Sequence, residues 1–136
     1  MLPFKVVLRS GESVYRQVVY AATRAVVAGE LPAGSAFPSV RELSQALKIN
    51  PNTAHKVIAE LVRDGILEVL PGRGTVVSAG RTASAREKRE LLSREVEQLV
   101  VEAKRLGLNE DDVLNAVSEC WADLSSDASR RGGTRK

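Results

Sequence analysis

Apolar residues recur at helical intervals in the first part of the chain. From Ser13 they fall three, four and seven positions apart, and Gly29 followed by Pro32 ends the pattern. A second, shorter run begins at Ser39, whose hydroxyl can form a capping box with Glu42. The pattern predicts a helix of about fifteen residues from Ser13 and a short second helix from Ser39.

A third amphipathic run starts almost immediately after the second. Asn50 is a good N-cap, Pro51 fits the first helical position because its missing N–H costs nothing there, and Gly65 ends the run. Two helices joined by about three residues cross steeply, as in a helix-turn-helix. The residues left on the outward faces of the third helix include Asn52, Thr53, His55 and Lys56.

Two β-rich runs follow, at residues 66–70 and 75–78, around a glycine-rich turn. They predict a β-hairpin with Arg73 at its tip. The order helix, helix, turn, helix, hairpin is that of a winged helix-turn-helix. We therefore expect residues 1–80 to form one such domain, and the fold to be mainly α with a small β-hairpin.

The rest of the chain predicts two further helices. From about Ser84 to Leu106 apolar residues step alternately by four and three positions, the rhythm of a helix packed along another helix. Asn109 opens a last helix with acidic residues in its first turn, where they favour the helix dipole. We expect this two-helix region to span residues 81–124, and the polar tail, residues 125–136, to be disordered.

Composition excludes several classes of protein. The chain has 136 residues, of which 43% are apolar and 27% charged, enough for one ordinary core. Its longest stretch without a charged residue, residues 31–40, contains two prolines, so we expect no membrane span, no secretion signal and a cytoplasmic location.

Cysteine and histidine usage narrows the chemistry further. One cysteine and one histidine cannot form a disulfide, a metal cage or, within one chain, a Cys–His nucleophile pair. No phosphate-binding glycine-rich loop opens a helix either. We therefore expect no enzyme, no metal and no cofactor. Cys120 is expected to be a buried thiol, and Trp121 to lie in a core or at an interface.

The net charge of +3 lies entirely in the first part of the chain. Residues 1–80 contain nine Lys and Arg against six Asp and Glu, whereas residues 81–136 contain eleven of each. Such an excess can attract a polyanion, although it can equally be an ordinary solvated surface. The positions of the polar side chains have to distinguish the two.

In a winged helix-turn-helix the third helix can enter a DNA major groove about 12 Å wide. Asn52 and Thr53 then lie at the start of that helix, where side chains reach base edges. Arg41 on the second helix can make a bidentate contact to guanine or phosphate, and Arg73 would lie in or across the minor groove. Further candidates on the exposed face of the third helix are His55 and Lys56.

Each candidate also has a purely structural interpretation. Arg41 could be a partner of Glu42 or Glu60, and Asn50 could serve only as a helix cap. Glycines alone could explain the turn at the hairpin tip. His55 and Lys56 could be ordinary exposed residues that contact no ligand.

Six spaced motifs occur in order between Val14 and Val77. They are Tyr15-Arg-Gln17, Gly29-Glu-Leu-Pro-Ala-Gly34, Phe37-Pro-Ser-Val-Arg-Glu-Leu43, Asn50-Pro-Asn-Thr53, Leu61-Val-Arg-Asp-Gly65 and Pro71-Gly-Arg-Gly-Thr75. Together they resemble the DNA-binding domain of GntR-type bacterial transcription regulators. The fourth motif resembles the short YtrA-like branch of that family.

The resemblance implies double-stranded DNA as the partner, with contacts from the second helix, the third helix and the wing. Some family members carry arginines where this chain has Pro51 and His55, so their base preference does not transfer. The DNA-binding candidates are Ser39, Arg41, Asn50, Asn52, Thr53, His55, Lys56, Gly72 and Arg73.

The resemblance also implies that the C-terminal pair of helices serves dimerisation. About forty residues in two helices are too few to enclose a typical metabolite pocket, so we expect no conventional effector domain and an unknown effector. We expect a homodimeric repressor that reads an inverted-repeat operator on the nucleoid. The residues expected at the dimer interface are Leu92, Val96, Leu99, Ala103, Leu106, Val113, Val117, Trp121 and Leu124.

A protein-interaction adaptor is the alternative function, because winged helices also serve in that role. An adaptor would have an apolar exposed face on the third helix. The predicted face consists of Asn, Thr, His and Lys, which favours nucleic acid.

Overall fold

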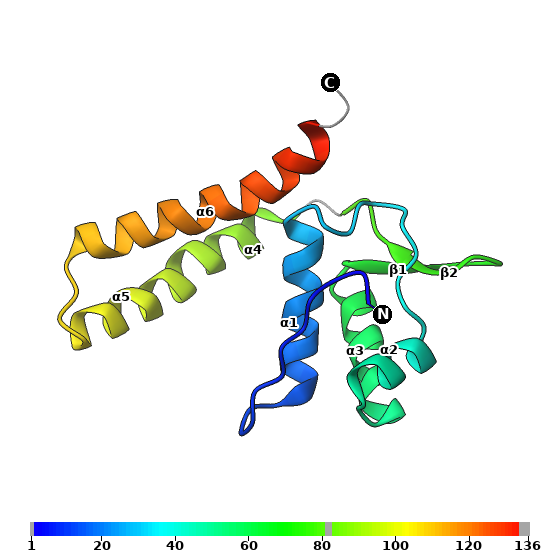
Figure 1. Ribbon diagram of the computed structural model, residues 1–136. Helices are drawn as coiled ribbons and strands as arrows, with labels where there is room; N and C mark the ends of the chain where they lie inside the picture. The colour runs from blue at the N-terminus through cyan, green and yellow to red at the C-terminus, as the bar shows by residue number, and fades with distance from the viewer. Residues whose placement is uncertain (1, 81–82, 134–136) are drawn as a thin grey trace. The chain divides into compact units, whose positions relative to one another are not determined.

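The computed structural model describes residues 2–80 and 83–133 (Figure 1). The chain divides into two compact units, one built on residues 1–80 and one on residues 81–125. The first unit confirms the predicted mainly helical fold with a small hairpin. Its elements are α1 (Val14–Val27), α2 (Val40–Leu47), α3 (Pro51–Arg63), β1 (Leu67–Leu70) and β2 (Gly74–Val77).

Side-chain caps fix where the helices of the first unit begin. The backbone N–H of Ser39 donates to Oε1 of Glu42 at 2.9 Å, and the N–H of Glu42 donates to Oγ of Ser39 at 3.1 Å. This is the predicted capping box of α2. At the start of α3, Oδ1 of Asn50 accepts from the N–H of Asn52 at 2.7 Å. Both predicted starts are therefore confirmed.

The core of the first unit lies between the three helices and the hairpin, with α1 and α2 both packed against α3. Val18 of α1, Leu43 of α2, and Val57 and Leu61 of α3 have no exposed surface. Burying a side chain of this size contributes roughly 1.5–3 kcal/mol. Because these residues fix which face of each helix is inside, the opposite faces of α2 and α3 are left to solvent.

The hairpin forms the wing and projects from the three-helix body (Figure 1). Its strands are antiparallel, with Leu67 opposite Val77. The connector between α1 and α2 lies along the other edge of β2, where the N–H of Phe37 donates to the carbonyl of Thr75 at 2.9 Å. This pairing fastens the wing to the helices.

A polar network joins α1 to the C-terminal half of α3. The hydroxyl of Tyr15 donates to Oε1 of Glu60 at 2.8 Å, and the guanidinium of Arg63 pairs with the same oxygen. Hydrogen bonds from Arg63 and Tyr15 hold the pKa of Glu60 below its usual value. The bond to Glu60 in turn raises the pKa of Tyr15. The network ties α3, which bears the predicted DNA contacts, to α1.

We expect Glu60→Gln to weaken the acid dependence of stability. The pKa of Glu60 is lower in the folded state than in the unfolded state, so its ionised carboxylate stabilises the fold. This contribution to the free energy of unfolding is present above the unfolded-state pKa, near 4.5, and is lost as the pH falls through the folded-state pKa. Thermal unfolding followed from about pH 6 to about pH 3 should show a smaller acid loss in the variant. Glu68→Gln, at an exposed carboxylate of β1, is the control and should retain the wild-type acid loss.

The second unit begins with one long helical run. Its elements are α4 (Ala85–Glu90), the π-helical turn η1 (Leu91–Glu95) and α5 (Val96–Arg105), after which α6 (Glu110–Gly133) returns in the opposite direction (Figure 1). The sequence predicted a single regular helix over the first three. In η1 the N–H of Val96 donates to the carbonyl of Leu91, an insertion that rotates the apolar positions after it relative to those before it.

The last helix runs further than predicted. α6 continues through the polar residues from 125 as far as Gly133, and residues 134–136 of the tail predicted to be disordered lie outside the described residues. Polar residues can continue a helix that is already nucleated upstream, because propagation costs less than nucleation. Cys120, predicted to be buried, is exposed, because α6 leaves this face uncovered within the described part of the chain.

Most of the predicted dimer-interface residues are exposed in the single chain. Trp121 is 74% exposed and Leu92 69%, so neither belongs to a core within the chain. Between residues 83 and 125, Ala103 is the only buried residue, and the interface candidates Val113 and Leu124 are half-buried. The other exposed interface candidates are Val96, Leu99, Leu106 and Val117.

Candidate nucleic-acid interface

Arg41 lies in the first turn of α2 and is exposed. The two carboxylates considered as its partners are engaged elsewhere. Glu42 accepts from the backbone of Ser39, and Glu60 binds Tyr15 and Arg63. Within the described ranges Arg41 has no ion pair, so its guanidinium is available for a bidentate contact.

The N-terminal half of α3 bears the other predicted contacts. Asn52, His55 and Lys56 are exposed, and Thr53 is half-buried. Asn50 uses its side-chain oxygen as the helix cap, which leaves its NH₂ group as the donor for a ligand. In the same way Ser39 retains its hydroxyl hydrogen as a donor.

The exposed surface of α3 is polar. Its exposed residues are Pro51, Asn52, His55, Lys56, Ala59 and Arg63, and in the described chain no large apolar side chain of this helix is exposed. The apolar face expected of an adaptor is therefore missing from the described helix. A helix with this face suits the groove of a nucleic acid.

Arg73 lies at the tip of the wing and is exposed. Its N–H donates to the carbonyl of Leu70 at 3.0 Å, which closes the turn. Gly72 has a φ of +77°, a conformation that side chains with a Cβ rarely adopt. The glycine thus allows a turn tight enough to hold Arg73 at the very end of the hairpin.

Lys48 is a further candidate for DNA contact that was not predicted from the sequence. It ends α2 in the left-handed conformation, with φ +56° and ψ +48°, and its N–H donates to the carbonyl of Ser44. Its side chain is exposed in the turn between α2 and α3. The short connection between the two helices was the available signal, because such a turn requires one residue of reversed conformation.

We expect Lys48→Gly to stabilise the domain by about 0.5–1 kcal/mol, because the left-handed conformation costs more for lysine than the added chain entropy costs for glycine. Thermal and denaturant unfolding measure the change. Ala46→Gly, at an exposed position inside α2, is the matched control and should destabilise by about 1 kcal/mol. A lower free energy of unfolding for Lys48→Gly than for the wild type would contradict strain at this position.

Comparison with known proteins identifies the family. Residues 14–77 match the family described as bacterial regulatory proteins, gntR family. Over 117 residues the chain is 32% identical to the HTH-type transcriptional repressor YtrA of Bacillus subtilis (strain 168), covering 85% of this chain and 90% of that protein. The chain belongs to the GntR family.

Solved structures are similar to this chain over most of its length. A transcriptional antiterminator from Listeria monocytogenes EGD-e is 25% identical, with a TM-score of 0.77 over 89% of this chain and 91% of that chain. YtrA from Sulfolobus acidocaldarius, a GntR-family transcription factor, is 25% identical with a TM-score of 0.50, over 88% and 97% of the two chains.

Membership in the YtrA-like group makes this chain a DNA-binding transcription regulator and not an enzyme. The predicted resemblance is therefore confirmed. Separately, none of the helices in residues 2–80 and 83–133 is long and apolar enough to cross a lipid bilayer.

Proposed function

We propose that this GntR-family regulator is a homodimeric repressor that reads an inverted-repeat operator. Residues 1–80 form the winged helix-turn-helix that contacts DNA, and residues 81–124 pair two chains. The observation that carries the proposal is the polar exposed face of α3 beside an unpaired Arg41 on α2. Repression is favoured by the similarity to the repressor YtrA. Such a protein acts in the cytoplasm, on the nucleoid.

The proposed contacts divide into two kinds. Arg41 and the start of α3, with Asn52 and Thr53, read base edges in the major groove. Lys56 and Arg73 contact the phosphate backbone and add salt-dependent affinity with little discrimination. The remaining members of the set, which position or assist these contacts, are Ser39, Asn50, His55 and Gly72.

The exposed apolar side chains of η1, α5 and α6 support pairing with a second copy. Apolar residues that are exposed along a helical seam are typical of an interface, because water contact with them is unfavourable. Two identical chains joined by a two-fold axis present two copies of α3 in opposite orientations, which is the symmetry of an inverted repeat. Trp121 and Leu92, the most exposed seam residues, are the proposed anchors.

Selection of genomic fragments with the full chain tests the proposal. Purified protein is mixed with sheared host DNA at fixed salt, and the bound fragments are sequenced. We expect a shared motif with two-fold symmetry and, on one such duplex, two protein chains by native mass spectrometry. A single chain on an isolated half-site, or half-sites in direct repeat, would contradict it.

A further inference from the structure

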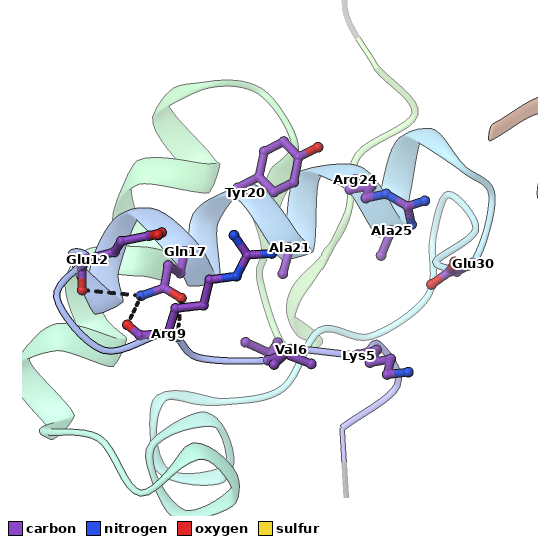
Figure 2. Close-up of a pocket in the computed structure, with 11 residues that line it drawn as sticks. Lys5, Val6, Arg9, Glu12, Gln17, Tyr20, Ala21, Arg24, Ala25 and Glu30 are labelled. Atoms are coloured by element: carbon purple, nitrogen blue, oxygen red, sulfur yellow. Dashed lines mark hydrogen bonds between the residues drawn. The ribbon is translucent and has the colours of Figure 1, made fainter. Parts of the chain in front are cut away.

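A cleft of about 520 Å³ lies in the first unit, between α1 and the N-terminal strap, which we define as residues 4–12 (Figure 2). This volume falls within the range of about 300–1,000 Å³ that small-molecule sites occupy. None of the residues proposed to contact DNA lines the cleft. The proposed DNA contacts therefore do not account for the cleft.

The N-terminal strap is fixed at both of its ends. Phe4 is 6% exposed and stacks on Phe37 with ring centroids 5.6 Å apart. At the other end Gln17 accepts from the N–H of Arg9 at 2.6 Å and donates to the carbonyls of Arg9 and Glu12 at 3.1 and 3.2 Å, as Figure 2 shows. The strap, which forms one wall of the cleft, is thus held at both ends by specific contacts.

Three cationic side chains line the cleft: Lys5 and Arg9 of the strap, and Arg24 of α1. Across the described part of the chain none of the three has a side-chain hydrogen bond or an ion pair. Figure 2 shows the guanidinium of Arg9 extending along α1 toward Tyr20. Cations grouped around a concave surface without partners favour an anion there.

Apolar groups lie beside these cations. Val6, Ala21 and Ala25 line the cleft, as does Tyr20, whose ring points away from the strap in Figure 2. The carboxylates of Glu12 and Glu30 lie at opposite ends of it (Figure 2). With three cations and two carboxylates the lining keeps one net positive charge, which favours an anionic ligand.

We propose that this cleft binds a small organic anion. The apolar body of the ligand lies on Val6, Ala21 and Ala25, and its carboxylate or phosphate group lies between Arg9 and Arg24. Guanidinium groups bind both of these anions through paired N–H donors. Because α1 packs against α3, the ligand contacts the helix that supports the DNA-contacting helix. The binding step itself does not depend on the identity of the operator.

Titrations of the ¹⁵N-labelled full chain, followed by NMR, test the proposal. The probes are benzoate and phenyl phosphate, with inorganic phosphate and benzyl alcohol as the anion-only and apolar-only arms. We expect saturable shifts of backbone signals from the strap and from residues 20–25 with the first two probes. The tighter of the two identifies the anionic group as carboxylate or phosphate.

Variants of single arginines complete the test. Arg9→Gln and Arg24→Gln should each weaken binding of the tighter probe by about tenfold or more. Arg16→Gln, at an exposed arginine of α1 that does not line this cleft, is the matched control and should leave the affinity unchanged.

Three results would overturn the proposal. The first is an equal response to inorganic phosphate alone, and the second is an affinity that Arg24→Gln does not change. The third is a loss of binding to random DNA in Arg9→Gln or Arg24→Gln as large as in Lys56→Ala, which would assign these arginines to the DNA backbone.

Discussion

Arg41→Ala is expected to weaken binding to the operator by about 1 to 3 kcal/mol more than it weakens binding to random DNA. The side chain of Arg41 is exposed, and the nearby carboxylates are engaged by Ser39, Tyr15 and Arg63. Its removal therefore leaves the fold intact and deletes one bidentate contact to a base pair. Fluorescence anisotropy with both duplexes at the same salt concentration measures the difference.

Lys56→Ala is the matched control for this prediction. A phosphate contact carries no sequence information, so its loss should lower affinity for the operator and random DNA alike. It should also reduce the slope of log K against log salt by about one. Equal losses on both duplexes for Arg41→Ala would refute a base-reading role and make Arg41 a second phosphate contact.

Leu99→Asp is expected to give monomers and to weaken operator binding by about 100-fold or more, through lost bivalency. Leu99 is 47% exposed in the single chain, so an aspartate there remains hydrated in the monomer. It loses that hydration only when a second chain covers it, which opposes pairing and not folding. Sedimentation velocity and operator binding on the same samples measure the two effects.

Gln98→Asp is the matched control, because it places the same charge on the neighbouring, exposed position of α5. Gln98 is not one of the apolar positions, spaced alternately four and three residues apart, that include Leu99. The control should remain dimeric and bind the operator as the wild type does. An intact dimer in Leu99→Asp would move the interface to another surface of the chain.

The local elements of this protein follow from short stretches of sequence. The capping box of Ser39 and Glu42 and the cap of Asn50 involve atoms within three residues of each other, so residue identity alone places the helix starts. The exposed face of α3 follows from its periodicity for the same reason. The predicted contacts Asn52, His55 and Lys56 are accordingly on the surface.

Interactions between distant residues could not be predicted in this way. Whether Arg41 is free depends on Glu60, whose partner Tyr15 lies 45 residues away on another helix. The wing is fastened by the connector at Phe37 and Thr75, again a contact between separate segments. Whether Cys120 is exposed depends on whether another segment packs on α6, and the local sequence around Cys120 does not determine that.

The sequence by itself determined the winged helix-turn-helix, the order of its elements and the residues of α3 that face outward, because caps and apolar periodicity act over a few neighbouring positions. Only the tertiary structure decided that Arg41 is unpaired, that Lys48 occupies a strained turn and that the strap forms a cleft against α1. Those properties depend on which groups separate parts of the chain bring together, and spacing along the sequence does not contain that information.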